Sequence, residues 1–313
     1  MDNFMISLNA IIPFLIYLAF GNISRRCGVF DEAFANKLNK VMFRLFFPCL
    51  TFCNMYNASW ETMPSATFML VVVGSVLGSI ALLCVLTPRF VPDRGRAGVV
   101  VQAIYRSNIL MYGLPLTLHI FGDEAGAMAS VWVTVVVAIY NVTAVLVLET
   151  FGSGSKTSLK QLAIGILKNP LLEGAVVGFA FFALGISLPA PVLKVVTNFS
   201  NMTTPLALFV LGSTLHFDAI RKNARCLTVS ILIKMVAAPA VMLAVGLALG
   251  LRGEELFLLV MTFAPPIATA SYPMAQNMGC DGELAGQFVV LSTVFSLPSL
   301  FGWILLMKSM NVL

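Results

Sequence analysis

The sequence predicts an all-α polytopic membrane protein with ten transmembrane helices, arranged as two inverted five-helix repeats. Three observations predict this class: the composition, the spacing of apolar runs and the distribution of basic residues. Of 313 residues, 59% are hydrophobic and 11% are charged, whereas soluble domains have about 45 to 50% apolar and about 25% charged residues. The mean hydropathy of +0.93 excludes a disordered chain, which needs low hydrophobicity. The length allows about ten crossings of roughly 20 residues each.

Apolar runs divide the chain into two halves of similar length. Residues 1–150 form the first predicted repeat, 151–160 a short cytoplasmic linker, and 161–313 the second repeat. Each run is long enough for one helical crossing of a bilayer. The predicted spans are 4–23, 36–57, 66–87, 97–120 and 124–149, followed by 161–184, 192–215, 226–250, 254–278 and 284–307.

Basic residues support this division, because Lys and Arg accumulate in cytoplasmic loops. An even number of spans with both termini extracytoplasmic leaves only Lys194, Arg252 and Lys308 in the outer segments. The residues assigned to the inner loops are Arg25, Arg26, Lys37, Lys40, Arg89, Arg94, Arg96, Lys156, Lys160, Lys168, Arg221, Lys222 and Arg225. The expected location is the plasma membrane or a bacterial inner membrane. The first apolar segment lacks a basic n-region and a cleavage site, so we expect it to be retained.

The two halves match weakly when they are shifted against each other. Gly122 then falls on Gly279 and Val133 on Val290, which superposes span four on span nine. Because each half has an odd number of spans, the second copy enters the membrane from the opposite side, as in many secondary transporters. The alternative is a chance match between apolar helices.

Spans four and nine contain residues that are predicted to break a helix. Asn108, Gly113 and Pro115 lie in the middle of span four. Proline frees backbone groups, which membranes tolerate only where they are buried or line a wet cavity. The N-termini of the resulting half-helices attract anions. The pattern therefore predicts one shared anion site, and the alternative is a pair of ordinary kinks. The breaking residues in span nine are Pro265, Pro266 and Pro273.

Three polar side chains stand out near the breaks. The amide of Asn108 can donate to a carboxylate, or it can satisfy its own broken helix. Lys234 lies about 18 Å into span eight. Its charge can attract an anionic substrate, or its side chain can contact the carbonyls freed by Pro239 or extend toward the membrane interface. Arg106 lies about 200° around a regular helix from Asn108. We therefore expect Arg106 to face elsewhere and to pair with Glu149.

Four further residues are expected to form cavity walls: Thr51 and Asn54 in span two, and Tyr140 and Asn141 in span five. Hydroxyls and amides at this depth can contact a polar ligand or serve helix packing.

Several kinds of site are not predicted. No carboxylate lies deep in a span, which argues against proton coupling through an internal Asp or Glu. A sodium site is a weaker alternative, with Thr262, Thr269, Ser271 and Gln276 as oxygen ligands. The six cysteines and two histidines have no metal-binding spacing, so we expect no metal and no cofactor. No catalytic motif occurs, and we do not expect an enzyme.

Short motifs spread over nearly the whole chain indicate a family. One is the Asn-x-x-x-x-Gly-x-Pro pattern of span four. The others are Pro48-Cys-Leu-Thr-Phe52, Lys168-Asn-Pro170, Leu208-Phe-Val-Leu-Gly212, Lys234-Met-Val-Ala-Ala-Pro239-Ala-Val-Met242, Ala264-Pro265 and Leu297-Pro298. Through these motifs the sequence resembles the auxin efflux carrier (PIN-like) family, within the superfamily of bile acid, arsenite and riboflavin transporters. Ala238 departs from the family pattern, which has glycine there.

This resemblance implies an elevator mechanism. Spans four and nine would cross at their prolines and bind a carboxylate with Asn108, Gly113, Pro115, Pro265 and Lys234. Spans 3–5 and 8–10 would form a moving transport domain. Spans 1, 2, 6 and 7 would form a fixed scaffold and the surface of a possible homodimer.

The predicted function is a secondary transporter for an organic anion, with a carboxylate such as auxin or a small dicarboxylate as substrate. The alternative is a non-transporting membrane receptor that binds a carboxylate in the same pocket. The expected partners are this anion and the lipid bilayer. Nucleic acid is not expected, because the basic residues form short alternating loops rather than one continuous face.

Overall fold

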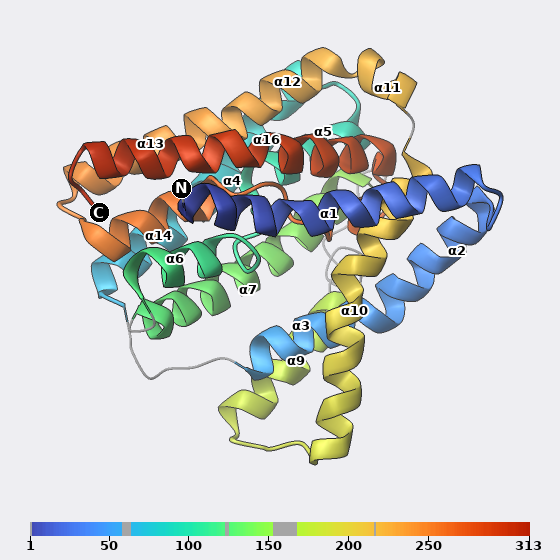
Figure 1. Cartoon of the computed structure of the whole chain (residues 1–313), viewed down its shortest axis with the longest axis horizontal. Coiled ribbons are helices and arrows are strands. Elements are labelled where there is room, and N and C mark those ends of the chain that lie inside the picture. Colours follow the sequence, from blue (N-terminus) through green and yellow to red (C-terminus); the bar gives the residue numbers. More distant parts are fainter. Residues whose placement is uncertain (1, 58–63, 123–124, 153–167, 216) are drawn as a thin grey trace.

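The computed structural model describes residues 2–57, 64–122, 125–152, 168–215 and 217–313. All regular elements in these ranges are helices, which form the single bundle of Figure 1. Most of the predicted linker 151–160, and residues 161–167 at the start of predicted span six, lie outside the described residues.

The helices of the first half follow the predicted spans closely, except that span four is divided. Their order places a long helix on each side of the divided span. They are α1 (Asp2–Arg26), α2 (Glu32–Val41), η1 (Met42–Phe46), α3 (Phe47–Tyr56), α4 (Ala66–Phe90), α5 (Arg94–Tyr105), α6 (Gly113–Phe121) and α7 (Gly126–Gly152).

The helices of the second half follow one another in a similar order, and here span nine is divided. These helices are α9 (Pro170–Ala183), α10 (Ala190–Thr214), α11 (Phe217–Lys222), α12 (Ala224–Leu232), η3 (Ile233–Ala237), α13 (Ala238–Ala248), α14 (Gly253–Phe263), α15 (Ser271–Asn277) and α16 (Gly282–Ser309).

Two helices contain a π-helical turn directly before a proline. The turn η1 precedes Pro48, and η3 precedes Pro239. A proline cannot donate to the carbonyl four residues earlier, and its ring crowds that carbonyl. The carbonyl of Met235, four residues before Pro239, instead accepts bonds from Trp303 Nε1 at 2.8 Å and Ser299 Oγ at 3.2 Å. The side chains of α16 therefore satisfy the carbonyl group that Pro239 leaves free.

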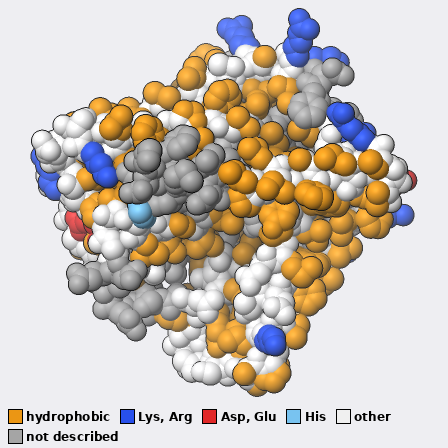
Figure 2. Space-filling view, in the orientation of Figure 1, with side chains coloured by type: hydrophobic (Ala, Val, Ile, Leu, Met, Phe, Trp, Pro, Cys, Tyr) orange, Lys and Arg blue, Asp and Glu red, His pale blue; other side chains and the backbone are white. Residues whose placement is uncertain are grey.

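Four described helices are long and apolar enough to cross a membrane: residues 66–90, 128–152, 224–248 and 282–309. The divided spans fall short of this length because each half-helix is only a few turns long. Apolar side chains are also widely exposed, with Phe90 at 80% and Leu70 at 73%. Figure 2 shows a broad hydrophobic surface with basic residues toward its edges. This surface is typical of a protein that contacts lipid.

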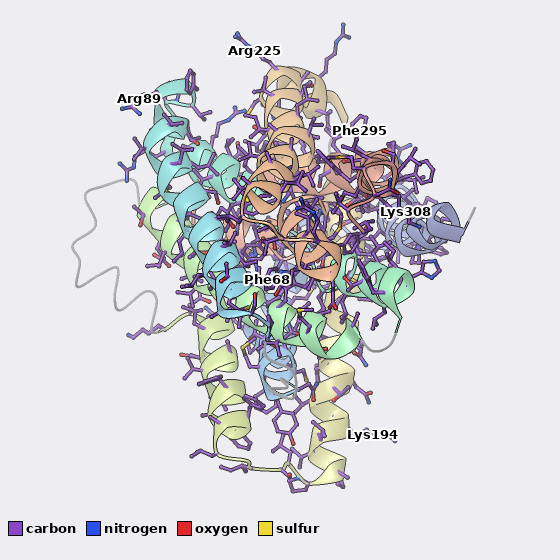
Figure 3. All side chains as sticks on the ribbon, turned by 90° about the vertical axis from the view of Figure 1, so that its left-hand side faces the viewer. Phe68, Arg89, Lys194, Arg225, Phe295 and Lys308 are labelled. Atoms are coloured by element: carbon purple, nitrogen blue, oxygen red, sulfur yellow. The ribbon has the colours of Figure 1, made fainter. Side chains whose placement is uncertain are left out.

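Basic side chains project from several sides of the bundle. Arg89 and Arg225 lie on one side in Figure 3, Lys194 lies on the opposite side, and Lys308 lies between them at the edge of the view. The long helix α16, which carries Lys308, is horizontal in Figure 1 and is seen nearly end-on in Figure 3, so it runs across the line from Arg225 to Lys194.

Glycines allow the closest helix contacts of one part of the bundle. A Cβ on Gly174 of α9 would collide with the Pro48 carbonyl of α3, and one on Gly178 with the Phe52 carbonyl. Gly21 and Gly212 bring α1 and α10 together in the same way. Small residues drive helix association in membranes because they let backbones approach closely.

Candidate functional site

Two helices are interrupted in the middle of the bundle. The first interruption separates α5 from α6 at residues 106–112, and the second separates α14 from α15 at residues 264–270. Pro265 and Pro266 lie inside the second interruption, whereas Pro115 and Pro273 are each the third residue of a half-helix. Proline is well tolerated in the first turn, where its missing N–H has no helical partner.

The two interrupted segments pair with each other. Ser107 and Ile267 form an antiparallel bridge, and the N–H of Asn108 donates to the Pro266 carbonyl at 2.8 Å. The N–H of Ile267 donates to Ser292 Oγ at 3.1 Å. These bonds satisfy backbone groups that no helix satisfies, a requirement deep inside a membrane protein.

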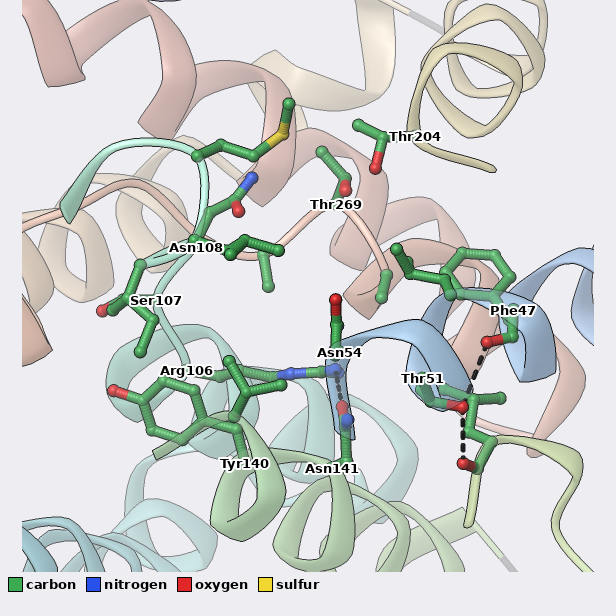
Figure 4. A pocket seen from close by; sticks show the side chains of 18 residues that line it. Phe47, Thr51, Asn54, Arg106, Ser107, Asn108, Tyr140, Asn141, Thr204 and Thr269 are labelled. Carbon is green, nitrogen blue, oxygen red and sulfur yellow. Dashed lines mark hydrogen bonds between the residues drawn. The ribbon is translucent and has the colours of Figure 1, made fainter. Parts of the chain in front are cut away.

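The pairing makes residues 106–108 extended, and this decides where their side chains point. Arg106 has φ −87° and ψ 112°, and in an extended strand residues two apart share a face. Figure 4 shows Arg106 and Asn108 reaching into the pocket, while Ser107 points the other way. The expectation that Arg106 and Asn108 face apart is wrong, because it assumed a continuous helix through a segment that is not helical.

The crossing forms one wall of a pocket with a volume of about 80 Å³. Helices α3, α7, α9 and α10 supply the other walls, so residues far apart in sequence meet there. The lining residues are Phe47, Leu50, Thr51, Asn54, Arg106, Ser107, Asn108, Ile109, Leu110, Met111, Val137, Tyr140, Asn141, Leu171, Thr204, Ala268, Thr269 and Ala270. None of them is acidic.

Two of the predicted wall residues use their hydroxyls elsewhere. Tyr140 donates to the Thr262 carbonyl at 2.6 Å, and Thr51 donates to the Leu171 carbonyl at 2.9 Å. Each hydroxyl hydrogen therefore serves backbone packing, and the Tyr140 bond anchors the end of α14. Tyr140 and Thr51 therefore contribute to the pocket mainly through the volume that their side chains occupy.

The predicted amides Asn54 and Asn108 are more available. Within the described parts of the chain, neither side chain has a hydrogen-bond partner. Each amide nitrogen offers two donors, so both can bind a carboxylate that enters the pocket.

Arg106 is the residue that the sequence interpretation missed. It is 4% exposed, and its guanidinium donates to Asn141 Oδ1 at 2.9 Å and to Met274 Sδ at 2.8 Å. Among the described residues, it forms no ion pair with Glu149 or any other carboxylate, and the predicted pair with Glu149 is therefore wrong. The predicted helix break could have identified Arg106, because in a segment that is extended rather than helical, residues two apart face the same side.

Lys234 lies behind the crossing and does not line the pocket. Its side chain is fully buried, and its Nζ donates to the hydroxyl of Ser107, on the face opposite Arg106 and Asn108. It supports the extended segment from the back. Gly113 is also structural in this arrangement, because a Cβ there would press into the Trp132 ring.

The possible sodium ligands do not converge. The hydroxyl of Thr262 donates to the Leu258 carbonyl and accepts from Trp132, while Gln276 bonds to Asn36 and Asn39 of α2. Only Thr269 of that set lines the pocket. The described residues also hold no cluster of three or more His, Cys, Asp or Glu side chains.

Comparison with known proteins gives matches over almost the whole chain. The family described as membrane transport protein matches residues 6–304. An "Uncharacterized transporter" of Methanothermobacter thermautotrophicus is 25% identical over 96% of this chain and 98% of its own length. A Rhizobium meliloti protein named "Putative malonate transporter" is 23% identical over 96% and 95%. Auxin efflux carrier component 8 of Arabidopsis thaliana is 20% identical over 96% and 97%.

Proposed function

The chain belongs to the membrane transport protein family, and on this basis we propose that it is a secondary transporter for a small organic anion. The family match agrees with the resemblance to auxin efflux carriers in the sequence, and its relatives include proteins with that name. The proposed substrate carries a carboxylate, and its site is the pocket at the crossing of the two interrupted helices.

The observation that carries this proposal is the polarity of the pocket. Among the described residues, Asn108 and Asn54 offer free amide donors, Arg106 offers a positive charge, and no side chain that lines the pocket is acidic. Helix α6 begins at Gly113, two residues after the lining residue Met111, so its N-terminal partial positive charge lies near the pocket. A negatively charged group is the complement of this set.

The helix bounds support two inverted repeats. Gly122 and Gly279, which are 157 positions apart, follow α6 and α15 and both have positive φ. When residue numbers are raised by 157, the bounds of α5, α6 and α7 agree with those of α14, α15 and α16 to within two residues. The bounds of α4 agree in the same way with those of the helix from Ala224 to Ala248. Equivalent helices on both sides of one site are the plan of alternating-access transporters.

The proposed mechanism is an elevator. Helices α4–α7 and α12–α16 form the proposed transport domain, and α1–α3, α9 and α10 the scaffold, which faces the pocket through Thr51 and Asn54. Gln276 of α15 bonds to Asn36 and Asn39 of α2 across this boundary. Movement of the transport domain would have to break these polar bonds.

The proposed orientation places both termini outside the cell membrane. Arg89 and Arg225 would face the cytoplasm and Lys194 would face outward, because basic residues accumulate in the cytoplasmic loops. The scaffold offers the surface for a proposed homodimer.

The test is counterflow in sealed proteoliposomes over a panel of carboxylates that includes indole acetate, malate and malonate. We expect saturable flux of at least one member, with a large loss in Asn108→Ala. Asn201→Ala is the matched control, because Asn201 is exposed on α10 and should leave flux unchanged.

The alternative function, a receptor that binds a carboxylate without moving it, gives a different result. Tight binding without flux in intact vesicles would support the receptor and contradict the transporter. Equal flux in Asn108→Ala and wild type would place the site elsewhere.

A further inference from the structure

The guanidinium of Arg106 lacks a counter-ion in the described structure. Arginine remains protonated in proteins, and a buried charge without a partner is strongly unfavourable. Asn141 and Met274 accept one bond each, but both are neutral and leave the charge uncompensated. Buried charged side chains with this free-energy cost usually mark a ligand site or an ion pathway in membrane proteins.

The neutral partners fix the orientation of the guanidinium. Asn141 lies on α7 and Met274 on α15, so Arg106 is held between two helices rather than free to rotate. Two of its five N–H donors are used in this way. The remaining donors are available to a ligand in the pocket that Arg106 lines.

Arg106 and Asn108 occupy different ends of the pocket. The guanidinium lies at Asn141, whereas Figure 4 shows the Asn108 amide toward Thr269. Apolar side chains, among them Leu50 and Val137, contribute the walls of the same pocket. The pocket thus has two polar ends and an apolar surround.

We propose that Arg106 binds a second carboxylate of the transported anion and makes the site selective for compact dicarboxylates. This proposal rests on the proposed transport function and deepens it. One carboxylate binds the amide of Asn108, and the other forms a charge-assisted, two-pronged bond with Arg106. The pocket volume of about 80 Å³ favours a short diacid over a bulky aromatic acid.

Asn141 is the positioning residue of this second subsite. Its Oδ1 holds Arg106 at 2.9 Å without neutralising it. An aspartate at this position would have nearly the same shape, but it would supply an internal counter-ion. Asn141→Asp should therefore occupy the guanidinium and exclude the second carboxylate of the substrate.

The experiment compares each diacid with its own monomethyl ester, which keeps the length and removes one charge. Counterflow in proteoliposomes is measured with malonate, succinate and their half-esters, for wild type, Arg106→Gln, Arg106→Lys and Asn141→Asp. Lys194→Gln, which removes an exposed cation, controls for general charge attraction. Melting in detergent with and without malonate gives a second readout that does not need transport.

We expect wild type to prefer each diacid to its half-ester. Arg106→Gln should weaken diacid transport and binding by about 10-fold to 100-fold, the range for a bond to a charged group. The ratio of diacid flux to half-ester flux should then fall close to one. Arg106→Lys should lose part of the preference, because an ammonium cannot bind a carboxylate in two-pronged fashion. Asn141→Asp should remove the preference while the protein melts at or above the wild-type temperature, because the aspartate compensates the buried charge of Arg106. Lys194→Gln should keep it.

Three outcomes would overturn the proposal. One is a wild type that moves half-esters as well as diacids. Another is Arg106→Gln lowering diacid and half-ester flux by the same factor, as a purely structural arginine would. The third is Asn141→Asp keeping the diacid preference. In each case flux of a monocarboxylate leaves the transport function standing, whereas no flux of any carboxylate by the wild type would refute that function itself.

Discussion

The two interruptions differ in what they contribute to the pocket. The first, residues 106–112, places Arg106 and Asn108 in it, which are a cation and an amide. The second, residues 264–270, contributes Ala268, Thr269 and Ala270. Both interruptions pair with each other through the backbone.

This difference separates two tasks that symmetric helices could have shared. In the proposed site, the first segment supplies the polar groups that bind the anion, and the second supplies backbone partners and small residues that leave space. The Pro266 carbonyl is the clearest example, because it accepts the N–H of Asn108 and so holds that residue in place. Two interrupted helices that cross therefore need not contribute equally to a pocket.

The largest effect is expected for Asn108→Asp. A carboxylate at this position would repel the carboxylate of the anion, and like charges brought together cost several kcal/mol. We expect transport to fall by about 100-fold or more, measured as kcat/KM in proteoliposomes. Thr269→Ala, the matched change in the second interruption, should lower it only slightly. Similar losses in both variants would break the asymmetry.

Lys234→Met is the next test, since it removes the support behind the first segment. Methionine fills similar space, but the Ser107 hydroxyl loses its bond from Lys234 Nζ, which should destabilise the fold by about 1 kcal/mol. A melting curve measures this. Because Lys234 does not line the pocket, the remaining folded protein should bind the anion with near-normal affinity. A stable variant that had lost anion binding would instead show that Lys234 attracts the substrate directly.

Ser292→Ala tests the backbone role of the second interruption. The change leaves the Ile267 N–H without its acceptor at 3.1 Å, so we expect a loss of stability of about 1 kcal/mol. The selectivity between diacid and half-ester should not change. A shift in that selectivity would mean that the second segment helps to choose the ligand.

The smallest effect concerns the loop that follows α15. Burial raises the pKa of the Cys280 thiol to about 12, whereas Cys27 is exposed. Thiolate is the reactive form, so maleimide at neutral pH should label Cys27 and spare Cys280 in a variant that keeps only these two cysteines. Labelling of Cys280 that appears only when substrate is added would show that this loop opens during transport.

The sequence allowed much of this arrangement to be predicted, because hydropathy and proline positions depend on local chemistry. The divided helices and the presence of Thr51, Asn54, Tyr140 and Asn141 at one pocket follow from such signals. Arg106 was misassigned since a helical wheel was applied across a break.

The orientation of Lys234 required the packing of η3 against the crossing, which no local pattern records. The use of the Tyr140 hydroxyl also depends on a partner 122 positions away, the Thr262 carbonyl. Long-range contacts of this kind have no signature in one sequence.

The most direct test of the account is an experimental structure of the protein with malonate bound. We expect density for malonate between Arg106 and Asn108, with one carboxylate on the guanidinium and the other on the amide. Density that lies outside this pocket, or that contacts Lys234 and leaves Arg106 without a partner, would contradict it.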